Sequence, residues 1–225
     1  MNSPDSISEP PIFRLRAVSF AYAPNRPVLK GADLILRRGE RLALVGPNGS
    51  GKTTLFHLMM GLVRPQAGTI EAFGAPRVHE RDFVEVRARV GLLFQDSDDQ
   101  LFSPTVLEDV AFGPLNFGRT PREARAIADR TLSLLGLDGF ADRVTHKLSG
   151  GERRLVALAT VLAMEPEALL LDEPSGGLDA ETFERLIGIL QHLPQAIIVI
   201  SHDEDLLALT TSRRCRLEKG RLHEG

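Results

Sequence analysis

A glycine-rich segment near residue 50 has the residue types and spacing of a phosphate-binding loop. Gly46-Pro47-Asn48-Gly49-Ser50-Gly51-Lys52-Thr53, which Thr54 follows, matches the pattern G-x4-G-K-[ST]. In such a loop the glycines let backbone N–H groups approach phosphate oxygens. Lys52 is then placed to bridge the outer two phosphates and the Thr53 hydroxyl to bind Mg²⁺. The alternative is a glycine-rich surface turn, which would not require the lysine and the threonine together.

A second segment looks like half of a phosphate site. In Leu148-Ser149-Gly150-Gly151-Glu152, the serine and the glutamate have capping-box spacing, and an apolar helical run follows at Leu155–Met164. Gly150 and Gly151 at the start of a helix expose N–H groups that can face an anion. No lysine lies beside them to neutralise a phosphate. The sequence therefore poses the question of what supplies the missing charge.

Two carboxylates follow an apolar strand-like run. Asp172 and Glu173 come directly after Ala168–Leu171. The ends of buried parallel strands lie beside the phosphate loop in sheets of this kind. Asp172 is the candidate Mg²⁺ partner and Glu173 the candidate general base for an attacking water. Without the upstream loop, the same residues would indicate an acidic helix cap before Pro174.

Two more polar residues end strand-like runs. His202 follows Ala196–Ile200, and Gln95 follows Val90–Phe94. We expect His202 to contact the outermost phosphate, and Gln95 to meet Mg²⁺ or the attacking water. An isolated histidine at a strand end is more often a structural hydrogen-bonding group, so this expectation depends on the neighbouring strand ends.

The elements that must position these residues form an α/β pattern. Arg41–Val45 is a short apolar run followed at once by the loop and a helix at Gly51–Met60. Other strand-like runs are Ile12–Phe20, Ala32–Leu36, Thr69–Phe73, Val90–Phe94, Ala168–Leu171, Ala196–Ile200, and a terminal hairpin of Arg213–Leu217 and Arg221–His223. Helical patterns include Pro121–Leu135, Leu155–Met164 and Ala180–His192. We predict an α/β fold with a mixed sheet, an antiparallel β subdomain and a helical subdomain inserted at about 96–165.

Composition restricts the classes of function. The chain has 225 residues, a net charge of −3 and a single cysteine, Cys215. This charge gives no argument for binding nucleic acid, and one cysteine cannot form a disulfide within the chain. No apolar run approaches the roughly 20 residues of a membrane span. We expect residues 1–11 to be a flexible tail and residues 12–225 to form one domain.

Taken together, the spaced motifs resemble the nucleotide-binding subunits of ABC transporters. The matching order is Tyr22, the loop at 46–53, Gln95, Leu148–Glu152, Asp172-Glu173, Gly177-Leu178-Asp179 and His202. The resemblance covers about residues 12 to 223 and implies a P-loop NTPase core that binds and hydrolyses ATP with Mg²⁺. It implies that Tyr22 stacks on adenine and that Lys52, Glu173 and His202 serve hydrolysis.

The resemblance also answers the question of the missing charge. Subunits of this family pair head to tail with two ATP molecules between them. It implies that Ser149, Gly150 and Gly151 of one chain close over the ATP held by Lys52 of the other, with Asp179 at the same interface. Glu152 departs from the more usual glutamine. Because a carboxylate facing phosphate would be repelled, we predict that Glu152 folds back on the Ser149 backbone N–H.

A narrower resemblance lies in the segment from Phe94 to Pro114, which looks like the ATPases of energy-coupling-factor transporters. It implies uptake of cobalt or nickel ions, or alternatively of a vitamin such as biotin. The implied partners are a second copy or a paralogue, a transmembrane coupling subunit and a substrate-binding membrane subunit, at the cytoplasmic face of the membrane. The candidate docking residues are Asp96, Asp98, Asp99, Leu101 and Phe102. Alternatively, the three aspartates belong to a solvated acidic loop that docks no partner.

Two rival functions are a soluble ABC ATPase of DNA repair or translation and a nucleotide switch without useful hydrolysis. Repair members carry long coiled coils or zinc motifs and translation members two such domains, and this sequence has neither feature. The presence of both Glu173 and His202 disfavours the switch.

Overall fold

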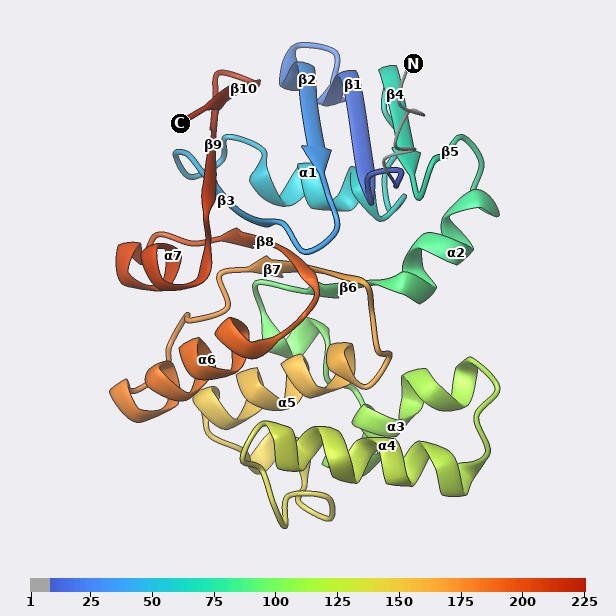
Figure 1. The fold of residues 1–225 in the computed structure, drawn as a ribbon, viewed down its shortest axis with the longest axis vertical. Coiled ribbons are helices and arrows are strands. Elements are labelled where there is room, and N and C mark those ends of the chain that lie inside the picture. The colour runs from blue at the N-terminus through green and yellow to red at the C-terminus, as the bar shows by residue number, and fades with distance from the viewer. Residues whose placement is uncertain (1–8) are drawn as a thin grey trace, which may run out of the picture.

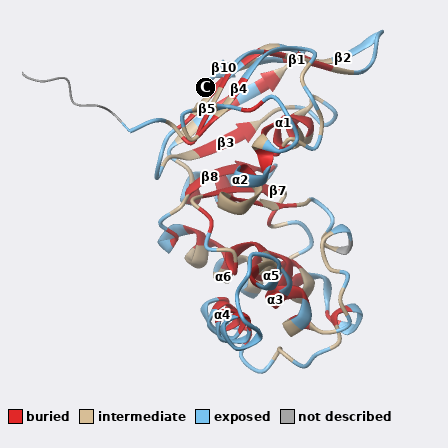
Figure 2. Ribbon diagram, turned by 90° about the vertical axis from the view of Figure 1, so that its right-hand side faces the viewer, coloured by how far each residue is buried: buried red, intermediate tan, exposed pale blue. Residues whose placement is uncertain are grey.

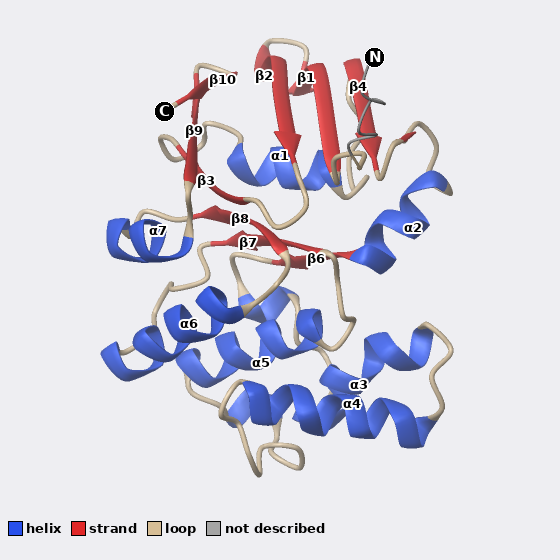
Figure 3. Ribbon diagram, in the orientation of Figure 1, coloured by secondary structure: helices blue, strands red, loops and turns tan. Residues whose placement is uncertain are grey.

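A computed structural model describes residues 9–225, so residues 1–8 of the expected tail lie outside the described part. Two sheets and a group of helices are stacked along the long axis of the molecule (Figures 1 and 3). Buried residues concentrate between these layers, whereas most connecting loops are exposed (Figure 2).

The first sheet is antiparallel. Strand β1 (Phe13–Ala23) pairs with β2 (Arg26–Leu36) on one side and with β4 (Ala67–Ala72) on the other, and the short β5 (Ala75–Pro76) extends the edge. Strands β1 and β2 are longer than the runs that the sequence predicts. Register shifts along their pairing interrupt the apolar alternation on which such a prediction depends.

The second sheet has six strands and holds most of the polar strand ends. Its order is β10 (Arg221–Glu224), β9 (Arg213–Glu218), β3 (Arg41–Val45), β8 (Ala196–Ile200), β7 (Ala168–Asp172) and β6 (Val90–Leu93). Only β10 runs antiparallel to its neighbour. Strands β7 and β8 are buried at every position, as strands covered on both faces must be. The predicted α/β fold with a mixed sheet and an antiparallel sheet is confirmed.

Helix α1 (Lys52–Met59) lies between the two sheets (Figure 1). Its side chains Leu55, Phe56 and Met59 belong to one buried cluster with residues of both sheets, such as Phe13 and Leu42. This packing fixes the start of α1, and hence the loop before it, against the end of β3.

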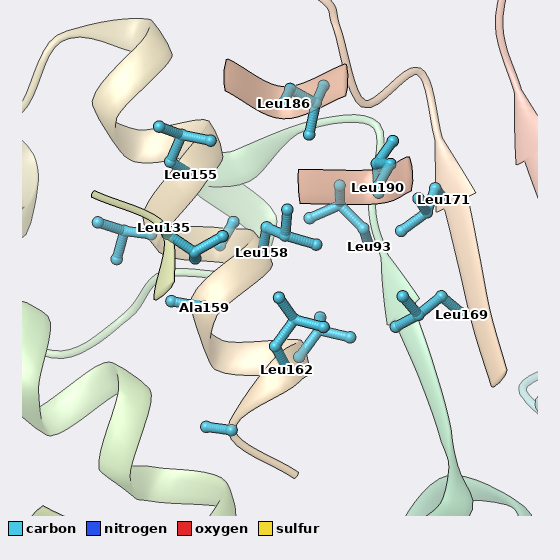
Figure 4. Close-up of a cluster of buried hydrophobic side chains, with 14 of the residues drawn as sticks. Leu93, Leu135, Leu155, Leu158, Ala159, Leu162, Leu169, Leu171, Leu186 and Leu190 are labelled. Carbon is cyan, nitrogen blue, oxygen red and sulfur yellow. The ribbon is translucent and has the colours of Figure 1, made fainter. Parts of the chain in front are cut away.

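Four helices lie on the side of the six-stranded sheet opposite α1 (Figure 1). They are α3 (Val106–Asn116), α4 (Pro121–Leu134), α5 (Gly150–Leu162) and α6 (Ala180–His192). Their buried apolar side chains form the second cluster with Leu93, Leu169 and Leu171 of the sheet, part of which Figure 4 shows. Helix α5 runs directly beneath the sheet, so its position is tied to the strands β6 and β7.

Two helices were not predicted from the sequence. Helix α2 (Asp82–Arg89) buries only Phe83 and Val86, and α7 (Glu204–Thr210) has seven residues. An apolar stripe that short gives little helical periodicity. Two single turns, Ser97–Asp99 and Thr145–Lys147, complete the helical elements.

Candidate functional site

The carboxyl ends of β3, β6, β7 and β8 meet at one edge of the second sheet, where the structure has a hollow of about 800 Å³. Most of the predicted nucleotide and metal residues line it. The lining residues are Tyr22, Val28, Asn48, Gly49, Gly51, Lys52, Thr53, Thr54, Gln95, Asp172, Glu173, Gly176, Ile200 and His202. Gly46, Pro47 and Ser50 complete the loop that forms one wall.

Backbone geometry explains two of the loop glycines. Gly46 has φ 150°, and a Cβ there would lie 2.2 Å from the Leu217 carbonyl oxygen. Gly51 has φ 105°, and a Cβ there would lie 2.5 Å from a methyl group of Val28. Any larger residue at either position would therefore move the loop away from β9 or β2.

Lys52 is the cation of the hollow. It is 7% exposed, and its Nζ donates to the carbonyl oxygens of Gly46 at 2.8 Å and Pro47 at 3.1 Å. Burial lowers the pKa of Lys52, while the charges of Glu173 and Asp172 oppose that shift. The ammonium group thus lies inside its own loop, at the start of a helix, where an anionic ligand would find both the charge and the helix dipole.

Thr53 and Asp172 form the candidate metal site. The Thr53 hydroxyl donates to Asp172 Oδ2 at 2.6 Å, across 119 positions of sequence. Burial raises the pKa of Asp172, and the Thr53 hydrogen bond and the Lys52 charge oppose the shift. Hydroxyl, carboxylate and the amide oxygen of Gln95 are the hard oxygen ligands that Mg²⁺ prefers, so this donor set fits that ion.

Glu173 faces His202 across the hollow. Glu173 Oε1 lies 3.4 Å from His202 Nε2, and the same nitrogen lies 2.8 Å from Asn48 Oδ1. Glu173 has φ 48°, a left-handed conformation that non-glycine residues adopt only where surrounding contacts hold them. The carboxylate is therefore presented from a constrained turn, next to an imidazole that links it to the phosphate loop.

Tyr22 lies at the rim of the hollow. Tyr22 is 63% exposed, and its ring meets that of Phe20 edge to face, with centroids 4.8 Å apart. Its hydroxyl lies 3.4 Å from that of Thr54. A supported aromatic ring with one open face suits stacking on a nucleobase.

We expect Tyr22→Ala to weaken ATP binding about tenfold, because base–aromatic stacking contributes about 1–3 kcal/mol. Tyr22→Phe retains the ring and is the matched control, with affinity close to that of the unchanged protein. Fluorescent ATP-analogue titration measures both, and equal losses in the two variants would assign the effect to the hydroxyl rather than to stacking.

The second glycine-rich segment lies outside this hollow. Ser149 caps helix α5, and Glu152 Oε2 accepts from the Ser149 N–H at 2.8 Å, which confirms the predicted fold-back. Glu152 Oε1 also accepts from Arg143 at 2.9 Å. The Ser149 N–H bond is the largest cause of the lowered pKa of Glu152. The carboxylate is thus engaged within its own chain.

Asp179 also serves as a cap. It begins helix α6 and accepts from the Thr182 N–H at 2.8 Å, and this bond is the main cause of its lowered pKa. Ser149, Gly150, Gly151 and Asp179 do not line the hollow. Within one chain, these four residues therefore stay apart from the nucleotide residues.

Of the five candidate docking residues, Leu101 and Phe102 differ from Asp96 and Asp99 in position. Leu101 and Phe102 line a different hollow, of about 760 Å³, together with Thr145 and His146. Phe102 is 67% exposed and packs edge to face on the half-exposed Phe112. Asp96 and Asp99 are exposed but do not line it, and nothing is described of the Asp98 side chain.

The structure adds residues that sequence reasoning missed. Val28, Gly176 and Ile200 line the nucleotide hollow, and the buried Arg154 lies behind it. Ile200 was recognisable as the last residue before Ser201-His202. Val28 and Arg154 had no such signal, because each reaches the site from an element distant in sequence.

Comparisons with known proteins agree with this geometry. The family model described as ABC transporter matches residues 29–176. A protein of Nitratidesulfovibrio vulgaris, named as a candidate ABC transporter ATP-binding protein, is 52% identical over 93% of this chain and 77% of its own length. The cobalt import ATP-binding protein CbiO of Rhodobacter capsulatus is 43% identical over 94% and 77% of the two chains. The energy-coupling factor transporter ATP-binding protein EcfA of Methanothermobacter thermautotrophicus is 41% identical over 94% and 69%.

Solved structures show the same fold. CbiO1 of Clostridium perfringens, part of the ABC transporter complex CbiONQ, superposes with a TM-score of 0.86 at 34% identity, covering 96% of this chain and 89% of its own. A dimeric bacterial ABC transporter cassette superposes with a TM-score of 0.86 at 27% identity, covering 95% and 97%. Among the helices of residues 9–225, none has the length and apolar character needed to cross a membrane.

Proposed function

This chain belongs to the ABC transporter family and is an ATPase of that family, and from this premise we propose that it energises a membrane importer of the energy-coupling-factor type. One observation carries the proposal for its chemistry. Lys52, Thr53, Asp172 and Glu173, from two separate stretches of sequence, meet in one hollow. The likeness to relatives named EcfA and CbiO supports the transport class.

We infer how the residues divide the work of hydrolysis. Lys52 binds the outer phosphates, and the loop backbone orients them. Mg²⁺, held by Thr53, Asp172 and Gln95, would neutralise charge on the phosphate oxygens. Glu173 accepts a proton from, or orients, the attacking water, and His202 contacts the outermost phosphate. Phosphoryl transfer depends mainly on such positioning and electrostatic stabilisation.

For the transported substrate we propose cobalt or nickel ions, and a vitamin such as biotin is the alternative. The name of the relative CbiO, a cobalt import protein, supports the metal. The test is to purify this chain together with the proteins that it binds and to identify those subunits and any bound ligand. ATPase activity is then measured with and without the partner subunits. A complex that carries no membrane subunit would overturn the transport proposal.

We propose that two copies, or this chain and a paralogue, pair head to tail at the cytoplasmic face of the membrane. Ser149, Gly150, Gly151 and Asp179 of one chain would then close over the ATP of the other. The dimeric cassette of similar fold supports this arrangement. So does the position of these residues, which are presented at helix starts outside the hollow of their own chain.

Gly150→Ala tests the pairing. A Cβ at Gly150 would meet nothing within 4 Å in the single chain, so the substitution should not destabilise the fold. We expect ATP affinity of the single chain to stay unchanged, while ATP-dependent pairing and turnover fall about tenfold, because the added methyl group would enter the closed interface. Gly188→Ala, which is also in a helix with open space at its Cβ, is the control. Light scattering with ATP measures the pairing, and identical results for the two variants would count against the interface.

For the membrane partner we propose docking at the hollow beside Leu101 and Phe102, with Asp96, Asp98 and Asp99 offering charge to a basic segment. We expect Phe102→Ala to reduce co-purification of the membrane subunits about tenfold, since a central exposed aromatic is the usual anchor of an interface. Intrinsic ATPase activity should not change. Val84→Ala removes a comparably exposed apolar side chain elsewhere, and unchanged co-purification with Phe102→Ala would refute the site.

A further inference from the structure

Arg154 is a buried cation behind the nucleotide hollow. It lies on α5, one turn after the Ser149-Gly150-Gly151 start, and is 3% exposed. Burial lowers its pKa, and the charges of Asp172, Glu173 and Asp96 oppose that shift. An arginine keeps its proton in proteins, so this position holds a full charge away from water. Such a charge is tolerated only where its N–H groups find acceptors.

Most acceptors of Arg154 are main-chain carbonyl oxygens at the ends of two strands, and the Ser97 hydroxyl is a further acceptor at 3.4 Å. After β6, its Nη1 donates to Phe94 at 2.7 Å and to Gln95 at 2.9 Å. At the end of β7, its Nη2 donates to the Asp172 carbonyl at 2.8 Å and to that of Glu173. Its Nε reaches the Pro174 carbonyl at 3.3 Å. One guanidinium thus holds together the two segments that carry Gln95, Asp172 and Glu173.

The backbone conformation of Glu173 depends on these contacts. Its φ of 48° lies in the left-handed region, which is costly for a residue with a Cβ. Its N–H donates to the Ile200 carbonyl at 2.8 Å, and its carbonyl accepts from Gly176 at 3.1 Å as well as from Arg154. The turn that presents the candidate base is therefore held by β8 on one side and by α5 on the other.

We propose that Arg154 is a positioning residue that fixes Gln95 and Glu173 relative to the Ser149-Gly150-Gly151 turn of the same chain. This inference rests on the proposed function. Helix α5 carries the turn that would touch the partner's ATP, and through Arg154 it also holds the base that acts on the chain's own ATP. Movement of α5 on pairing is thereby transmitted to the backbone of Glu173, so hydrolysis at one site depends on contact at the other.

Arg154→Lys in the full chain separates positioning from binding. Lysine keeps the charge but has three N–H donors on one atom, so it cannot hold both strand ends at once. We expect turnover to fall about 100-fold, the loss that a misplacement of about 1 Å can cause. The dissociation constant for ATP should stay within about threefold, because Arg154 does not line the hollow. Arg154→Gln, which is uncharged, provides a second variant. It should likewise lose turnover while its dissociation constant for ATP changes little.

Arg77→Lys is the matched control. Arg77 is also buried, and its guanidinium donates to main-chain oxygens, at 2.8 Å and 3.2 Å to Ala72 and at 2.9 Å to Asp82, outside the nucleotide hollow. A stability effect common to buried arginines should lower the melting temperature of both variants, whereas only Arg154→Lys should lose turnover.

The outcomes are distinct. Turnover of Arg154→Lys or Arg154→Gln that matches Arg77→Lys would overturn the proposal, as would a parallel loss of ATP affinity and turnover. Absence of ATPase activity in the unchanged protein, alone and with its membrane subunits, would instead refute the proposed function.

Discussion

Glu173→Gln is expected to lower ATP turnover about 1,000-fold while ATP still binds, because general-base catalysis contributes about 10²–10⁴-fold. Glutamine preserves the shape of the side chain but cannot accept the proton of the attacking water. The Glu173 carboxylate lies 3.4 Å from His202 and lines the hollow together with Lys52 and Thr53. Among the described residues, Asp172 is the one other carboxylate that lines this hollow.

The same variant should trap the closed pair. If ATP closes two chains and hydrolysis reopens them, a chain that binds without hydrolysing remains paired. Light scattering in the presence of ATP should show a stable dimer for Glu173→Gln and a transient one for the unchanged protein.

Glu165→Gln is a matched control for this variant. Glu165 also has a left-handed backbone, with φ 50°, but it does not line the hollow. We expect its turnover to be that of the unchanged protein. Unaltered turnover in Glu173→Gln would remove Glu173 from the catalytic role and leave His202 as the candidate base.

Lys52→Ala is expected to weaken ATP binding and to abolish turnover. The Lys52 ammonium is held at the loop by two carbonyl oxygens, and a phosphate would take the place of these acceptors. Two hydrogen bonds from a charged group, at about 1.5–3 kcal/mol each, correspond to a loss of about 100-fold or more in ATP affinity. Isothermal titration with ATP and Mg²⁺ measures this loss directly.

The result differs in kind from that of Glu173→Gln. Lys52→Ala should bind ATP weakly and fail to pair, whereas Glu173→Gln should bind ATP and pair. Lys30→Ala, which removes an exposed lysine of β2, controls for the change in net charge and should bind ATP normally. If Lys52→Ala retained full affinity, the glycine-rich loop would not be the nucleotide site.

Much of this protein was predictable because the signals lie within short stretches of sequence. The phosphate loop is eight consecutive residues between an apolar strand and a helix, and its geometry follows from its glycines and that context. The capping of α5 by Ser149 and Glu152 follows in the same way from their spacing, and the structure shows it. The buried parallel strands were predicted correctly from their continuous apolar runs.

Other features were not predictable from short stretches. Register shifts hid the full lengths of β1 and β2, and α2 and α7 bury too few side chains to leave a periodic pattern. Nor did the sequence show that Leu101 and Phe102 line a hollow that Asp96 and Asp99 do not line.

By itself, the sequence determined the type of chemistry to expect: a phosphate loop, a candidate metal ligand, a candidate base and a second glycine-rich turn, since each depends on neighbours along the chain. Only the tertiary structure decided how these parts are joined. The bond between Asn48 and His202 spans 154 positions, and Arg154 reaches Phe94 across 60 positions and Glu173 across 19. The first contact depends on β3 and β8 being neighbours in the sheet, and those of Arg154 depend on how α5 packs beneath it. The direction of a side chain between layers is set by packing and not by local periodicity.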